Sequence, residues 1–209
     1  MDTRERILRE GTTLFKKYGV RSVTMDDIAK ELSISKKTIY QFFKDKDEIV
    51  TIAMQDFVEQ EKAEYIAVVD EVKNAVEELA MITKCIREDF DDINPSLIFD
   101  LQKYHPKAWD IIKEFKNNFL RKALVRSIEN GIEEGVFRDN LDPEVMAVLR
   151  VEQINMACDH QLFPLDKFSI YETHMKLLDH YISGIVTDKG KEYYNNFLQQ
   201  IDIPTTNHH

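Results

Sequence analysis

Four lysines and three aromatic residues are interleaved in the stretch SKKTIYQFFKDKDEI, residues 35–49. At about 100° per residue, a helix through this stretch gathers several polar side chains on one arc. They are Lys36, Lys37, Tyr40, Gln41 and Lys44. Ammonium, amide and phenol groups donate hydrogen bonds to phosphates and base edges, and the major groove of DNA admits one helix. The arc therefore has the makeup of a DNA recognition helix, and the alternative is the solvated face of an ordinary three-helix unit.

The other side of the same helix is apolar, with Ile39, Phe42 and Phe43, and Thr38 lies at the margin. We expect both phenylalanines to lie in the core.

The distribution of charge along the chain is a weaker indication of DNA binding. Residues 1–50 hold 11 Lys+Arg and 9 Asp+Glu, a net of +2, and residues 51–209 hold 17 and 29, a net of -12, which together give -10. This asymmetry suggests that the N-terminal part meets a polyanion, although a solvated charged surface would look similar.

Helical signals precede and follow this stretch. Apolar residues at one helical face end at Gly19, a typical C-cap. Thr24 with Asp27 has the spacing of a capping box, Ser35 is an N-cap for a helix to about residue 43, and Asp45 caps a fourth helix. Short helices joined by a few residues predict a helix-turn-helix. We expect Ala29 to allow close approach of its two helices, with Ile34 and Ile39 filling the angle between them.

The rest of the chain also predicts helices, and Gly (6) and Pro (5) are scarce. The expected ranges are about 46–70, 72–89, 107–134, 142–161, 165–186 and 191–200, with Asp142 and Pro143 opening the fourth. The expected fold is therefore all-α.

No stretch has the length of a membrane span, and the first residues do not resemble a secretory signal. Cys85 and Cys158 have no metal spacing, so we expect core thiols in a reducing cytoplasm and no cofactor.

The segment RERILREGTTLFKKYGVRSVTMDDIAKELSISKKTIYQFFKDKDEIV, residues 4–50, resembles the tetracycline-repressor (TetR) family of bacterial regulators. The matching features are a small residue, a tight turn, a Ser-initiated helix with Thr-aliphatic-Tyr, an aromatic pair and a lysine. Here they are Ala29, Ser33-Ile34, Ser35, Thr38-Ile39-Tyr40, Phe42-Phe43 and Lys46. Two positions depart from the family pattern. Ser33 stands where glycine is common, and Lys37 stands where Gly or Pro is common.

The resemblance implies a three-helix DNA-binding domain at 1–46 and a helical ligand-binding and dimerisation domain at 47–209. It implies major-groove or groove-edge contacts for residues 36–38, 40 and 41 and phosphate contacts for Thr24, Tyr40, Lys44 and Lys46. The full expected set is Thr24, Ser35, Lys36, Lys37, Thr38, Tyr40, Gln41, Lys44 and Lys46. It also implies a homodimer through helices at about 142–161 and 165–186, which would hold two recognition helices about 34–36 Å apart on a palindrome.

The resemblance further implies a mostly apolar small-molecule pocket in the larger domain. The candidate lining residues are Phe99, Tyr104, Trp109, Ile112, Phe115, Phe119, Glu152, Asn155 and Met156. Any one of the aromatic residues could instead be ordinary core. The polar run Glu152 to Asn155 could line the pocket or the dimer interface.

The expected function is a ligand-responsive dimeric transcriptional regulator, most simply a repressor that a small molecule releases from double-stranded DNA. An enzyme is the second hypothesis, but the six histidines have no catalytic or metal spacing and no phosphate loop or nucleophile elbow is present. A helical partner protein without DNA binding is the third, and the exposed lysines argue against it. The sequence leaves open the operator, the effector, the regulated genes, and repression versus activation.

Overall fold

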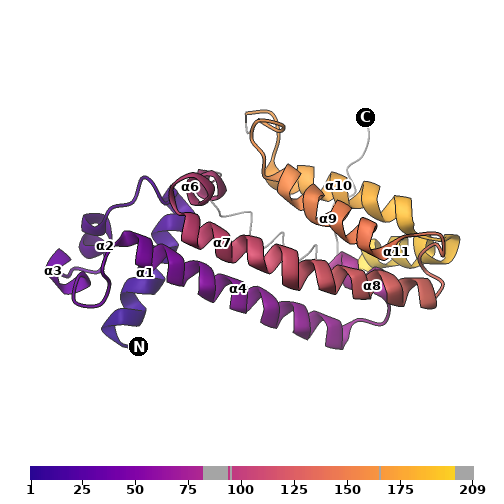
Figure 1. Ribbon diagram of the computed structural model, residues 1–209, viewed down its shortest axis with the longest axis horizontal. Helices are drawn as coiled ribbons and strands as arrows, with labels where there is room; N and C mark the ends of the chain where they lie inside the picture. The colour runs from indigo at the N-terminus through magenta and orange to yellow at the C-terminus, as the bar shows by residue number, and fades with distance from the viewer. Residues whose placement is uncertain (82–93, 95, 165, 201–209) are drawn as a thin grey trace. The chain divides into compact units, whose positions relative to one another are not determined.

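The computed structural model describes residues 1–81, 94, 96–164 and 166–200, and every regular element in these ranges is a helix (Figure 1). The helices are α1 (Thr3–Tyr18), α2 (Met25–Glu31), α3 (Lys36–Ile39), α4 (Lys46–Glu71), α6 (Ser96–Tyr104), α7 (Pro106–Glu114), the π-helix η1 (Phe115–Leu120), α8 (Arg121–Glu133), α9 (Pro143–Ala157), α10 (Ile170–Ile185) and α11 (Asp188–Gln200). The all-α prediction is confirmed. In these ranges no helix is both long and apolar enough to cross a membrane.

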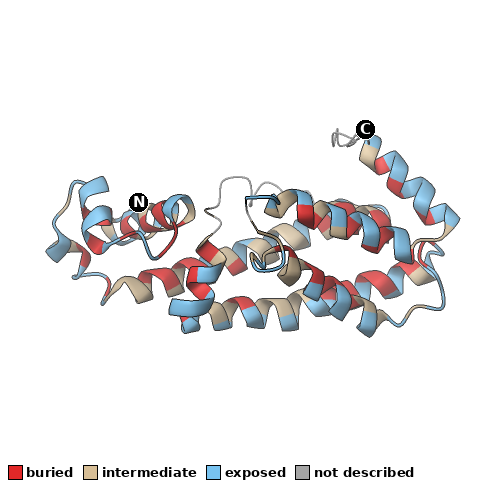
Figure 2. Ribbon diagram, turned by 90° about the horizontal axis from the view of Figure 1, so that it is seen from above, coloured by how far each residue is buried: buried red, intermediate tan, exposed pale blue. Residues whose placement is uncertain are grey.

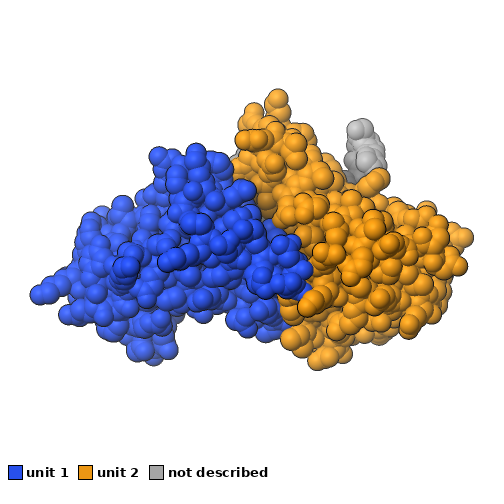
Figure 3. Space-filling model, viewed as in Figure 1, with its two compact units in different colours: residues 1–63, 88–118 blue, residues 64–87, 119–209 orange. Residues whose placement is uncertain are grey.

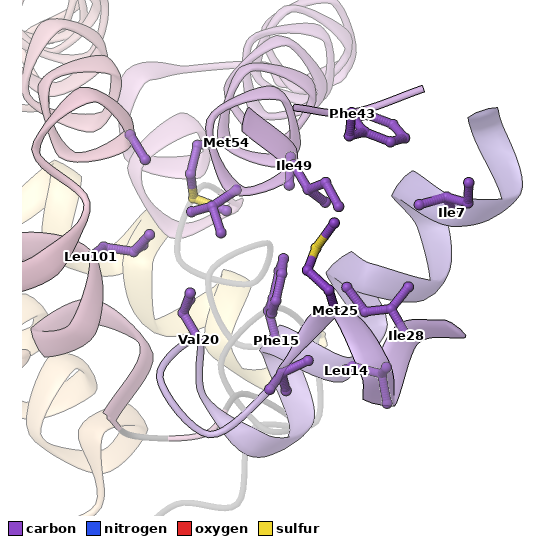
Figure 4. Packing of buried hydrophobic residues seen from close by; sticks show 14 of the residues in the cluster. Ile7, Leu14, Phe15, Val20, Met25, Ile28, Phe43, Ile49, Met54 and Leu101 are labelled. Carbon is purple, nitrogen blue, oxygen red and sulfur yellow. The ribbon is translucent and has the colours of Figure 1, made fainter. Parts of the chain in front are cut away.

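The chain divides into two compact units (Figure 3). Unit 1 comprises residues 1–63 and 88–118, and unit 2 comprises residues 64–87 and 119–209. The predicted boundary after residue 46 separates the DNA-binding domain from the ligand-binding and dimerisation domain, and it stays a prediction. The hydrophobic core of unit 1 continues beyond it, because Ile49 and Met54 of α4 and Leu101 of α6 belong to the same buried cluster as Phe15 and Phe43 (Figure 4).

Local signals fix the start and end of α1. Asp2 accepts a hydrogen bond from the Glu5 backbone N–H, and the Glu5 side chain accepts one from the Asp2 N–H. The helix ends at Gly19, whose φ of 80° lies in the region that favours glycine. A Cβ there would lie 2.5 Å from the Ser96 Oγ atom, so the position excludes a side chain as well.

Unit 2 has its own core, formed by α8 to α11 and the helical residues 75–81. Buried residues follow one side of each helix (Figure 2). Ile128, Phe137 and Ile182 are almost fully buried there. Gly131 lies under the Phe137 ring, which an added Cβ would meet at 2.1 Å. The side chain at Phe137 is therefore accommodated only because residue 131 has none.

Several predicted helices differ from the structure, and that expected at 142–161 ends at Ala157. The expected helix at 107–134 is divided by the π-helix η1, which contains two consecutive asparagines, residues of low helix propensity. The expected helix at 165–186 begins at Ile170, because Ser169 caps it and Lys167 and Phe168 donate to the Pro164 carbonyl in a preceding turn. Of the helix expected at 72–89, residues 75–81 are helical and residues 72–74 are not, and residues 82–89, with Cys85, lie outside the described residues.

Candidate nucleic-acid interface

The first helix of the predicted helix-turn-helix is held by its own cap. Asp27 N–H donates to the Thr24 Oγ1 at 3.2 Å, and Thr24 N–H donates to the Asp27 carboxylate at 2.8 Å. Hydrogen bonds from Thr24 lower the pKa of the Asp27 carboxyl. The predicted capping box is confirmed, and it fixes the start of α2 beside the surface expected to meet a phosphate.

The turn between α2 and α3 contains one residue in the left-handed region, Ser33, with φ 54°. Ile34 N–H donates to the Ala29 carbonyl at 3.0 Å, which closes the turn. Left-handed backbone is unfavourable for residues with a Cβ. Ser33 therefore carries strain at the position where related proteins commonly have glycine, and the departure noted in the sequence has a conformational cost.

Ser35 caps α3, as predicted, by accepting from the Thr38 N–H at 3.0 Å. The α-helical part is shorter than expected and ends at Ile39. Gln41 N–H then donates to the Thr38 carbonyl and Phe42 N–H to the Ile39 carbonyl, which is the tighter i to i+3 pattern. Phe43 N–H donates to the same Ile39 carbonyl at 3.0 Å, so the chain leaves the regular α-helix after Ile39 through a turn of mixed hydrogen-bond pattern.

One of the two predictions about the aromatic pair is wrong. Phe43 is buried at 1% exposure, and the guanidinium of Arg4 lies 5.2 Å from its ring centre. Phe42, also predicted to be core, is 40% exposed. Ile39 is fully buried, as expected. The outward face thus gains an aromatic side chain that the sequence analysis had assigned to the interior.

The polar arc is exposed as the sequence suggested, at Lys36, Lys37, Tyr40, Gln41 and Lys44. Lys36 is engaged at this surface, because its Nζ lies 2.8 Å from the Asp26 carboxylate on α2. That contact raises the pKa of the Lys36 ammonium. Both partners are exposed, so the pair is weak and a phosphate can exchange with Asp26 at small cost.

Lys46 has a different environment from the other lysines of the stretch. Its Nζ donates to the carbonyl oxygens of Val20 and Val23, each at 2.9 Å, and burial lowers the pKa of its ammonium. Two of its three N–H groups therefore hold the link between α1 and α2. Its expected phosphate contact stays a prediction, and its position indicates that it also supports the fold of the DNA-binding segment.

Residues from α6 and α7 complete unit 1 around this segment. The buried carboxylate of Asp100 accepts from the Arg21 N–H at 2.9 Å. The His105 Nδ1 lies 2.8 Å from the Asp47 carboxylate in the first turn of α4. These contacts fix the ends of α1 and α4, the two helices that flank α2 and α3.

The predicted pocket residues are distributed over both units. In unit 1, Phe99 and Tyr104 are exposed and meet edge to face at 6.4 Å. Ile112 is buried in the core of unit 1, with Trp109 and Phe115 packed against it. Ile112 is core, Trp109 and Phe115 are half-buried at the edge of that core, and Phe99 and Tyr104 lie on the surface. Their role as ligand contacts stays a prediction.

In unit 2, Phe119 meets the Tyr65 ring edge to face at 5.5 Å. Glu152 is exposed and accepts from the Asn155 Nδ2 at 3.4 Å, and Met156 is half-buried. The buried member of the polar run is Gln153 instead, at 6% exposure. The sequence analysis did not single out Arg150, which is buried one turn before Gln153. Its position between Ala147 and Gln153 on one helical face could have indicated that Arg150 is buried.

The fold and the exposed arc on α3 define a helix-turn-helix DNA-binding protein. Residues 7–51 match the family description "Bacterial regulatory proteins, tetR family". This segment of the chain is therefore a TetR-family DNA-binding domain by sequence.

Two relatives and one solved structure agree with this assignment. The "Uncharacterized HTH-type transcriptional regulator YvaF" of Bacillus subtilis (strain 168) is 27% identical over 187 residues, which is 88% of this chain and 96% of the relative. The "HTH-type transcriptional repressor KstR2" of Mycobacterium tuberculosis (strain ATCC 25618 / H37Rv) is 27% identical over 146 residues, 68% of this chain and 73% of the relative. These relatives are regulators, and the chain is a regulator rather than an enzyme.

The solved structure is a putative transcriptional regulator from Saccharomonospora viridis in complex with choline. It matches 88% of this chain and 97% of its own with a TM-score of 0.73. At 23% sequence identity this likeness shows the fold alone.

Proposed function

We propose that the protein is a dimeric repressor that leaves a palindromic operator when a small molecule binds. The single observation that carries the DNA-binding part is the exposed arc of Lys37, Tyr40 and Gln41 on the capped helix α3 and the turn that follows it. The named repressor among the relatives supports repression over activation. The protein would act in the cytoplasm, where it reaches DNA directly.

We assign these exposed residues two roles, contact with base edges and contact with phosphates. Lys37, Tyr40 and Gln41, with Thr38, present donors that suit base edges in the major groove. Lys44 at the end of the arc and Thr24 at the N-terminus of α2 suit phosphates, which position the domain without choosing sequence. Lys36 is held by Asp26 in the free protein and would exchange that carboxylate for a DNA phosphate.

An exposed apolar stripe on α9 supports the homodimer. Val145, Val148 and Leu149 are 55%, 40% and 44% exposed, and their spacing places them on one face. Such a face in a helical protein suits a second copy, because apolar patches of this kind mark interaction sites. On α10, the helix also expected at the interface, nothing lies within 4 Å of the position of a Cβ at Gly184. The space there is compatible with the close approach of a partner helix.

The response to a ligand would run through α4, because this helix contributes residues to both units. An effector in unit 2 that favours one position of α4 would change how the two recognition helices fit the operator. Such coupling requires that the effector bind the two forms with different affinity. The S. viridis protein in complex with choline supports a small-molecule site in this fold.

Fluorescence anisotropy with DNA from upstream of the protein's own gene tests this proposal at two salt concentrations. The double substitution Lys36→Glu with Lys37→Glu is expected to lower operator affinity by at least about a hundredfold, because two phosphate or base donors become repulsive. Circular dichroism should show an unchanged fold. The charge-matched control is Lys103→Glu with Lys107→Glu, which alters two exposed lysines of α6 and α7.

Equal loss in both double variants would mean that net charge, rather than the α3 surface, governs DNA binding. Unchanged binding in the α3 variant would overturn the recognition-helix assignment. Absence of binding by the unaltered protein at low salt, on its own promoter and on a scrambled fragment, would favour the helical partner protein instead.

A further inference from the structure

Arg150 of α9 lies in the interior of unit 2 at 3% exposure. Its Nη2 donates to the Nε2 of His174 on α10 at 2.8 Å. Its guanidinium carbon lies 5.9 Å from the ring centre of Tyr181, also on α10. The other terminal nitrogen, Nη1, is buried and has no hydrogen-bond partner. Buried donors in proteins are almost always paired, so this one requires an explanation.

The positive charge of Arg150 is also uncompensated within unit 2. His174 accepts a hydrogen bond from it and is neutral, since burial and the charge of Arg150 lower the pKa of His174 to about 3. Burial lowers the pKa of Arg150 to about 10, which leaves it cationic at neutral pH. In the part of the chain that the structure describes, Arg150 forms no ion pair with a carboxylate. A buried charge without a counter-charge is strongly unfavourable.

The side chains around Arg150 indicate what kind of ligand would pair with its unpaired nitrogen and balance its charge. Gln153 lies one turn further along the same face of α9, is 6% exposed, and has a buried Oε1 without a partner. Rotation of its amide would present N–H donors instead. Tyr181 and Tyr194 both act electrostatically on Arg150, and Leu178 and Ile182 belong to the same buried cluster as these tyrosines. The surroundings therefore combine one cation and one amide with aromatic and aliphatic surface.

We propose that Arg150 binds the carboxylate of an organic acid, which is the effector of this regulator. The inference rests on the proposed function, because it assumes that unit 2 holds the effector. One guanidinium and a neutral histidine match a monoanion, whereas a doubly charged phosphate would leave excess negative charge in the interior. A water molecule could satisfy the Nη1 hydrogen bond but would not neutralise the charge. The apolar surroundings suit an acid whose remaining part is hydrocarbon.

The position of Arg150 connects this site to the response. Arg150 and His174 join α9 to α10, so a carboxylate that pairs with Nη1 alters the packing of these two helices. The same helix α9 carries Val145, Val148 and Leu149 on its exposed face. Binding at Arg150 would thus act on the helix proposed to contact the second copy.

The test uses the full chain and measures its thermal midpoint with benzoate, hexanoate and decanoate, and with the corresponding primary amides. At about 100 times its Kd, an acid that binds the folded protein should raise Tm by about 5 °C. The amides should have no effect, since they lack the charge. Arg150→Met should reduce the affinity for the acid at least about tenfold. Arg150→Gln serves as a second variant should the methionine perturb folding.

Arg121→Met is the matched control, because Arg121 is an exposed arginine of unit 2 that pairs with Glu144. It should respond to the acids like the unaltered protein. Equal shifts in the Arg150 variants, or no shift with any acid, would overturn the inference.

The operator assay distinguishes the two proposals. Release from DNA only by uncharged compounds would overturn the inference and leave the proposed function standing. An Arg150-dependent rise in Tm without release would support the anion site and count against the proposed response.

Discussion

The α2–α3 segment and the α9–α10 pair differ in how completely their polar groups are paired. In the first, caps at Thr24 and Ser35 and the internal contacts of Lys46 engage the polar groups locally. In the second, Arg150 keeps a buried unpaired nitrogen, and three apolar side chains of α9 face outward. The first is a self-sufficient structural unit that presents a surface. The second has the properties of a segment whose stable form includes other molecules.

The largest expected effect separates the two adjacent phenylalanines of the first region. Phe43→Ala should lower the free energy of unfolding by about 3 to 5 kcal/mol, because it removes a fully buried ring from the core. Phe42→Ala should change it by less than about 0.5 kcal/mol, since the side chain is exposed. Chemical denaturation measures both. Similar losses in the two variants would mean that Phe42 is buried in solution.

In the second region, Val148→Glu with Leu149→Glu should weaken dimerisation by roughly a hundredfold or more, because two charges per protomer would be buried at the interface. Sedimentation velocity over a range of protein concentrations measures the effect. Lys191→Glu is the control, since it makes the same change of net charge at an exposed site on α11. A dimer of unchanged stability would place the interface elsewhere.

The pH dependence of stability tests the interior of the second region. The pKa of His174 is about 3 in the folded protein and about 6.5 in an unfolded chain, so the unfolded state binds the proton first as pH falls. The contribution of His174 to the free energy of unfolding is complete above about pH 6.5. It decreases by about 2 kcal/mol between pH 7 and pH 5. The charged group that acts on His174 is Arg150 of α9, and Arg150 in turn interacts with Tyr181 of α10 and Tyr194 of α11.

The variant His174→Gln should remove this part of the pH dependence while still accepting from Arg150. Denaturation at pH 7 and pH 5 provides the comparison. The control is His180→Gln, an exposed position on the same helix. An identical pH profile for the unaltered protein and His174→Gln would contradict the buried neutral histidine.

The smallest expected effect is in the turn of the first region. Ser33→Gly should raise the free energy of unfolding by about 1 kcal/mol, because φ 54° is unfavourable for serine and not for glycine. Ser35→Ala, two residues later, should lower it by about 1 kcal/mol through loss of the α3 cap. Thermal denaturation measures both shifts. A destabilising Ser33→Gly would mean that the serine side chain has a contact that outweighs the strain.

The local features of this protein could be predicted from the sequence because they depend on residues a few positions apart. Thr24, Ser35 and Asp142 are N-caps in the structure, and Gly19 ends α1, as their neighbours along the chain indicated. The exposed arc of α3 follows from helical periodicity for the same reason. The all-α fold and the helix-turn-helix were therefore determined by the sequence alone.

The tertiary structure decided the features that depend on distant parts of the chain. Whether Phe42 or Phe43 is buried depends on which ring meets the core of unit 1. Lys46 turns inward because the carbonyls of Val20 and Val23 lie beside it, more than twenty positions earlier. Arg150 is buried because α10 packs against its face of α9. Periodicity places a residue on a face of its helix, but only the packing of other helices determines whether that face is in solvent or in the interior.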